Sequence, residues 1–132
     1  EIPDYLATNP PLEVLRLANN QLYDNDAILI ARALKRNTNL RRFYLGQNNF
    51  TDLGCDALRN AIFDSTSLNA VAASNHSCKI DGVDLDEDSI PFNLTDVSAG
   101  KNRGRKIYRL LSSRHREGIN VRHLDAEFDD AS

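Results

Sequence analysis

The sequence contains no methionine and no tryptophan, and it has only two cysteines in 132 residues. Because translation begins with methionine, a chain that starts with Glu1 and contains none is expected to be a trimmed piece of a longer product. Two cysteines are too few for the disulfide framework that stabilises small secreted domains. The sequence therefore predicts an intracellular and cytoplasmic protein, or an organellar one if a targeting segment lies in the missing N-terminal part.

Long apolar runs and a strong excess of one charge are also absent. No run approaches the roughly 18 residues that a membrane-spanning helix needs, and no signal-peptide pattern opens the chain. Sixteen Lys and Arg against nineteen Asp and Glu give a net charge of -3, whereas a nucleic-acid-binding domain is usually strongly basic. We therefore predict a single domain with no membrane span and no specific nucleic-acid partner.

One stretch of the sequence occurs again at a fixed distance. Residues 12–22 return 28 positions later as residues 40–50, with leucines, a phenylalanine and an asparagine at matching places. Alternation around Leu15 and Leu17 predicts a short strand, and apolar residues at helical spacing after Asp24 and Asp52 predict helices capped by these two residues. Residues 68–78 match at the same offset with smaller apolar residues, and His76 replaces the asparagine.

The pattern Leu-x-x-Leu-x-Leu-x-x-Asn-x-Leu followed by a helix resembles the leucine-rich repeat, and the period with a full helix is similar to the ribonuclease-inhibitor-like subfamily. The resemblance implies an α/β solenoid with short parallel strands on its concave face, α-helices on its convex face and a C-terminal helical cap. It also implies that Asn20 and Asn48 form a hydrogen-bonded ladder, and that the chain is the C-terminal end of an array. Residues 74–80 and 106–111 resemble tails of repeat proteins from diatoms and related algae.

The expected organisation follows from the repeat and from two shifts in composition. A partial repeat at 1–11 precedes full repeats at 12–39 and 40–67 and a degenerate repeat at 68–80. An acidic loop at 81–100 leads to a basic amphipathic capping helix at 101–116, with Asn102 as a candidate cap, and to a polar tail at 117–132. The apolar columns expected to stack between strands are Leu12/Leu40/Leu68, Leu15/Phe43/Val71 and Leu17/Leu45/Ala73.

No catalytic or metal-binding pattern stands out. Residues 84–88 resemble the opening of a calcium loop, but Ser89 and Thr95 occupy the places that need glycine and glutamate. Cys55 and His76 would be the candidate catalytic dyad, yet Cys55 is expected to point into the core and His76 to lie in a turn. We predict that the protein is not an enzyme and has no metal and no cofactor.

The sequence predicts that the concave face binds a partner. Strand alternation puts Val14, Arg16 and Ala18 beside Arg42 and Tyr44, with Ala70, Ala72 and Ser74 expected on a third strand. Arg and Tyr are favoured at interfaces, and the resemblance implies a protein partner, so we predict a non-catalytic protein-interaction module. The alternative for Arg16, Arg42 and Tyr44 is a merely solvated strand surface.

A second hypothesis concerns the basic helix. Seven bases and no acid lie between Lys101 and Arg116. In this hypothesis the protein is an architectural subunit or fragment, permanently docked in a larger complex through Arg103, Arg105, Lys106 and Arg109.

Overall fold

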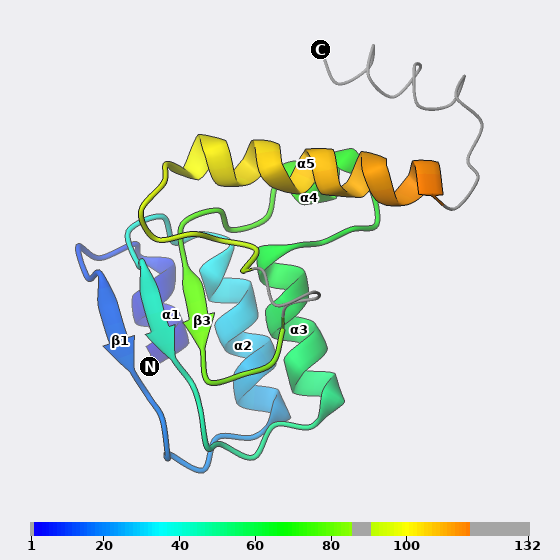
Figure 1. The fold of residues 1–132 in the computed structure, drawn as a ribbon. Helices are drawn as coiled ribbons and strands as arrows, with labels where there is room; N and C mark the ends of the chain where they lie inside the picture. The colour runs from blue at the N-terminus through cyan, green and yellow to red at the C-terminus, as the bar shows by residue number, and fades with distance from the viewer. Residues whose placement is uncertain (1, 86–90, 117–132) are drawn as a thin grey trace.

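A computed structural model describes residues 2–85 and 91–116. The elements in chain order are α1 (Ile2–Ala7), β1 (Val14–Arg16), α2 (Asp24–Leu34), β2 (Arg42–Tyr44), α3 (Asp52–Ile62), α4 (Leu68–Ala72), β3 (Lys79–Asp81) and α5 (Ala99–Arg116). Figure 1 shows the three strands as one layer and helices α1, α2 and α3 as a second layer behind it. The fold class is α/β. The predicted polar tail and residues 86–89 of the predicted calcium-like segment lie outside the described residues.

The sheet is parallel, in the order β1-β2-β3. Leu15, Phe43 and Ile80 are register partners, and their side chains point toward the helices. Phe43 and Leu45 are fully buried in the core between the two layers. Burying one such side chain contributes about 1.5–3 kcal/mol, so these apolar positions bring the short strands together.

Helices α2 and α3 begin at the predicted cap residues Asp24 and Asp52, so the cap position lies one residue earlier in each. Tyr23 and Thr51 hold the cap positions, and the Thr51 hydroxyl accepts a hydrogen bond from the Leu53 amide. Asp24 does not cap its own helix but connects two repeats. Its carboxylate accepts hydrogen bonds from the Thr51 hydroxyl and from the Thr51 and Gly54 amides of the next repeat. These bonds, that of the hydroxyl above all, lower the pKa of Asp24. A Cβ at position 54 would lie 2.4 Å from Oδ1 of Asp24, so a larger residue there would displace this carboxylate from its hydrogen bonds.

The prediction of a third strand at residues 68–74 is wrong. Residues Leu68–Ala72 form helix α4, and β2 pairs instead with Lys79–Asp81, so that Arg42 faces a residue 37 positions later. The expected columns through Leu68, Val71 and Ala73 are therefore not strand columns. The reason is local: the Ser67 hydroxyl caps the helix by accepting from the Ala70 amide, and alanine favours helix over strand.

Buried asparagines connect the units at the edge where the helices end and the strands begin. We call Asn37, Asn75, Asn93 and Asn102 the buried asparagine row, because each is at most 4% exposed. Asn37 donates to the Leu6 carbonyl and Asn75 to the Leu34 carbonyl, near the C-terminal ends of α1 and α2. Their side-chain oxygens accept from backbone amides two and three residues later. The row thus satisfies peptide groups that water cannot reach.

Helix α5 lies across this edge and packs against α4 (Figure 1). It includes the helix predicted at 101–116. The expected cap, Asn102, is wrong: the Ser98 hydroxyl accepts from the Lys101 amide, whereas Asn102 is buried and donates to the His76 and Leu94 carbonyls. Asn102 therefore anchors the helix to the row instead of starting it.

Lys106 completes the same edge from α5. Its ammonium group is buried and donates to the carbonyls of Ile62 and Asn75 and to Nδ1 of His76, at 2.7, 2.8 and 2.9 Å. Ile62 ends α3, so Lys106 serves the third helix as Asn37 and Asn75 serve the first two. Burial, and then the charge of Arg105, lower the pKa of Lys106 to about 7.

Leu45→Ala tests the core of the sheet. Leu45 is fully buried, and removing such a side chain leaves a cavity in addition to the lost apolar burial. We expect the free energy of unfolding, measured by urea denaturation, to fall by about 3 kcal/mol. Leu53 is 65% exposed, so Leu53→Ala is the matched control and should change it by no more than about 0.5 kcal/mol. Equal losses in the two variants would contradict this account of the core.

The contact between Lys106 and His76 predicts a dependence of stability on pH. Burial lowers the pKa of His76 below its usual 6.5; the charges of Lys106 and Arg103 also lower it, while the Ala72 carbonyl raises it. The unfolded chain therefore binds this proton first, and stability should decrease as the pH falls below about 6.5 toward the folded-state pKa. The corresponding loss from Lys106 develops as the pH falls from about 10.5 to about 7, so most of it precedes the titration of His76.

The measurement is thermal unfolding of the wild type and of His76→Asn between pH 7 and pH 5. Asparagine keeps an acceptor for Lys106 but does not titrate. We expect a smaller decrease in melting temperature for the variant than for the wild type over this interval. Parallel curves would show that His76 is not the titrating group.

Candidate functional site

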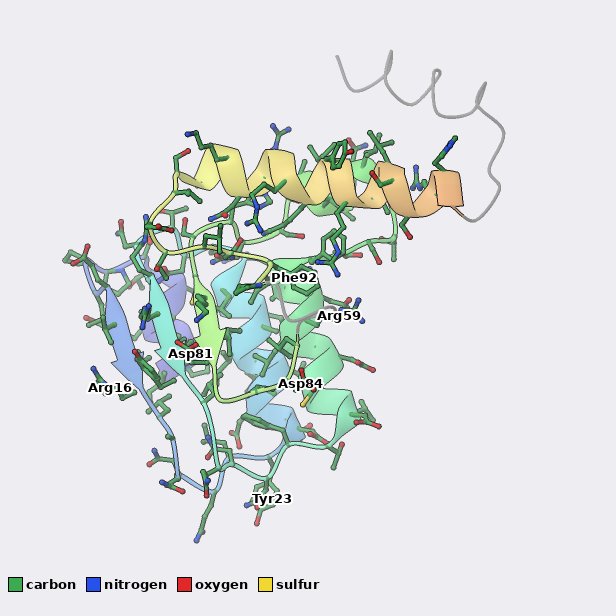
Figure 2. The ribbon with its side chains drawn as sticks, viewed as in Figure 1. Arg16, Tyr23, Arg59, Asp81, Asp84 and Phe92 are labelled. Carbon is green, nitrogen blue, oxygen red and sulfur yellow. The ribbon has the colours of Figure 1, made fainter. Side chains whose placement is uncertain are left out.

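One face of the sheet carries no helix formed by residues 2–85 or 91–116. Its six side chains, hereafter the open face, are Val14, Arg16, Arg42, Tyr44, Lys79 and Asp81, each on the side of its strand opposite the core residues. In Figure 2, Arg16 and Asp81 mark the two sides of this face. Val14 and Arg16 are exposed, and the other four are partly buried. The predicted fifth residue, Ala18, follows β1 and is also exposed.

Three of the predicted residues touch one another. The Arg16 guanidinium carbon lies 4.7 Å from the centroid of the Tyr44 ring, and Nη1 of Arg42 donates to the Tyr44 hydroxyl at 3.1 Å. We call Arg16, Arg42 and Tyr44 the tyrosine cluster. The hydrogen bond to Tyr44, the charge of its phenolate form and the Asp81 carboxylate raise the pKa of Arg42. Guanidinium groups carry a positive charge in proteins.

Two residues of the open face were missed by the sequence analysis. Lys79 and Asp81 lie on β3, and their charged groups are 3.0 Å apart. A signal existed in the asparagines that precede each strand: Asn9, Asn37 and Asn75 are each followed three residues later by Leu12, Leu40 and Cys78. This spacing, unlike the fixed period of 28, locates the third strand to within one residue, since Arg42 follows Asn37 by five residues and Lys79 follows Asn75 by four.

The two asparagines predicted to form a ladder lie in the turns after β1 and β2. Asn48 joins both turns, because its side-chain oxygen accepts from the Asn20 and Leu22 amides and its nitrogen donates to the Leu17 and Leu45 carbonyls. The Asn20 side chain donates to the Ala18 carbonyl of its own turn. These contacts hold the backbone at the carboxyl ends of the strands.

Several basic side chains of the predicted docking helix contact other residues of the protein instead of solvent. Lys106 is buried, so its assignment as a docking residue is wrong. Arg105 donates to the Phe92 and Pro91 carbonyls and to the Asn102 side chain, and Arg109 lies 4.8 Å from the centre of the Phe92 ring. Of the four residues named for docking, Arg103 is the exposed one.

The reactive side chains do not assemble into a chemical centre in the part of the chain that the structure describes. Burial raises the pKa of the Cys78 thiol to about 12, and burial together with four nearby carboxylates raises that of Cys55. The His76 ring is held by the Ala72 carbonyl and Lys106. Within residues 2–85 and 91–116 no three His, Cys, Asp or Glu side chains are grouped to hold a metal ion.

None of the described helices is long and apolar enough to cross a bilayer.

Comparison with known proteins agrees with the strand-and-helix units. A family model described as "Leucine Rich repeat" matches residues 8–31 and 36–58, which hold β1 with most of α2 and β2 with most of α3. The human NACHT, LRR and PYD domains-containing protein 5 is 31% identical over 86 residues, which are 64% of this chain. The chain spans 7% of the length of that relative. No solved structure matches. The chain therefore carries two leucine-rich repeats.

Proposed function

We propose that the protein is a non-catalytic interaction module that binds another protein through the open face of its sheet. The observation that carries the proposal is the tyrosine cluster. Arg16 and Arg42 form no ion pair with any residue in 2–85 or 91–116, although both are held in place by Tyr44. A partner is the natural source of the missing anions, since Arg and Tyr are favoured residues at the centres of protein interfaces.

The architecture supports this use of the sheet. Leucine-rich repeats generally mediate contacts between proteins, and short parallel strands side by side present their outward residues as a regular grid. Val14 is 41% exposed beside Arg42, which gives a partner an apolar contact next to the charged one. Such a mixture of apolar and charged contacts is typical of protein interfaces.

We also propose the finer architecture that the sequence predicted. The units form a solenoid of the ribonuclease-inhibitor-like type, with the sheet on its concave face, and this chain forms the C-terminal end of an array. Support comes from the 28-residue spacing of Asn20 and Asn48 and from the 11-residue helices α2 and α3. Helix α5 acts as the cap, supported by its contacts through Asn102 and Lys106 with the last repeat.

The alternative is that the protein docks in a larger complex through α5. Fewer side chains of α5 are available for docking than the sequence predicted. The exposed side chains that favour it are Lys101, Arg103 and Tyr108, the last of which is 75% exposed. The neighbouring Lys106 has no share in it because it is buried.

Replacing the tyrosine cluster tests the proposal. The immobilised wild type and a triple variant, Arg16→Ala, Arg42→Ala and Tyr44→Ala, are each exposed to an extract of the protein's own source cells, and the retained proteins are compared by quantitative mass spectrometry. Loss of a hot-spot side chain costs more than about 1 kcal/mol, so we expect at least one retained protein to fall more than about fivefold.

The matched control removes one tyrosine and two basic residues from the helical side, as Tyr5→Ala, Arg32→Ala and Lys35→Ala. All three side chains are exposed, and the control should retain the same proteins as the wild type. A third variant, Lys101→Ala, Arg103→Ala and Tyr108→Ala, examines α5. If the α5 variant loses a retained protein more than about fivefold and the cluster variant loses none, the protein binds its partner through α5 and not through the open face.

A further inference from the structure

We infer that the open face recognises an acidic protein segment whose carboxylates are bound by Arg16 and Arg42 on either side of Tyr44. The inference rests on the proposed function and adds to it the chemical class of the partner. It follows from three features of the face: how the two guanidinium groups are held, how their charge is left unbalanced, and where the single acid of the face lies.

The guanidinium groups are held by one aromatic side chain. Arg16 lies over the Tyr44 ring at 4.7 Å, and Arg42 uses one of its five N–H donors on the Tyr44 hydroxyl at 3.1 Å. The Arg16 guanidinium donates no hydrogen bond within residues 2–85 and 91–116, so its N–H donors are available there. Both groups can therefore bind a carboxylate with two parallel hydrogen bonds, and little side-chain freedom remains to be lost on binding.

The charge of the face points to the same ligand. Arg16, Arg42 and Lys79 stand against Asp81 alone, although the whole chain has a net charge of -3. Lys79 is already paired with Asp81 at 3.0 Å, so the unbalanced positive charge is on β1 and β2. An acidic segment fits there, whereas a basic one would meet two fixed guanidinium groups.

Asp81 makes the β3 side of the open face less favourable for a carboxylate than the side of β1 and β2. It lies beside Tyr44 in the register of the sheet, on the side opposite Arg16. A carboxylate bound over β1 and β2 gains from both arginines, and one displaced toward β3 meets Asp81. Val14 adds an apolar contact on the favoured side, next to Arg42. The best segment thus combines carboxylates with an aliphatic residue.

Fluorescence anisotropy tests the inference with a fluorescein-labelled peptide of sequence Glu-Glu-Asp-Leu-Glu-Glu-Asp-Leu-Glu-Glu and its amide counterpart, in which Gln and Asn replace the acids. At about 0.15 M ionic strength we expect the acidic peptide to bind wild type at least about tenfold more tightly than the amide peptide. The variant Arg16→Gln with Arg42→Gln should lose about tenfold or more of that affinity. Arg16→Lys with Arg42→Lys should recover only part of it, because lysine keeps the charge but not the paired hydrogen bonds.

The matched control is Arg32→Gln with Lys35→Gln, which removes the same charge from the helical side and should bind as the wild type does. Equal losses in this control and in the Arg16/Arg42 variant would overturn the inference, since bulk charge would then explain the binding. So would equal affinity for the acidic and amide peptides. A single-stranded oligonucleotide of equal charge that bound as tightly would overturn the assignment to a protein segment.

The two proposals fail in different ways. If the triple cluster variant loses proteins from the extract while the acidic peptide does not bind, the open face is an interface and its preference for acids is wrong. If the cluster variant loses none and the peptide does not bind, both proposals are wrong.

Discussion

Most of this fold depends on one requirement: the last carbonyls of each helix are buried and must accept a hydrogen bond. Three carbonyls spaced 28 residues apart meet it in turn. Asn37 donates to Leu6, Asn75 donates to Leu34, and Lys106 donates to Ile62. The first two donors come from the following repeat. After α3 no such asparagine follows in the described chain at the same place, and a lysine from α5 reaches the carbonyl instead. A positive charge suits the C-terminal end of a helix, and its three acceptors offset the cost of its burial.

The same requirement decides where each strand begins. The side-chain oxygens of Asn37 and Asn75 accept from amides two and three residues later, which turns the chain into β2 and β3. Between these asparagines the chain contains α4, which the preceding interval lacks. The additional residues do not disturb the sheet, because Asn75 binds the end of α2 regardless of how many residues separate it from Asn37. Strand position therefore follows the asparagine, to within one residue, and not the leucine period.

This explains how far the sequence could predict the structure. In the first two units the leucine period and the asparagine spacing agree, so β1, β2, α2 and α3 were located, and alternation along the strands identified Arg16, Arg42 and Tyr44. In the third unit the two patterns disagree. Leu68 and Val71 fit the period of 28, but alanines and the Ser67 cap make that stretch a helix. Lys79 and Asp81 were missed for this reason. The burial of Lys106 has no local signal, since lysine is almost never fully buried unless it is paired, and its acceptors come from residues 62, 75 and 76.

Folding and recognition consequently use different parts of the molecule. The buried asparagine row and the apolar layer fix the positions of the strands without any contribution from the open face. The tyrosine cluster is held by a cation–π contact and one hydrogen bond at a partly exposed site, each worth only about 1 kcal/mol. Its arginines are thus weakly required for stability but well placed by the strands that carry them. The constraint that determines the fold lies at the edge of the sheet. The identities of the residues on its open face are therefore not constrained by folding and can be suited to binding.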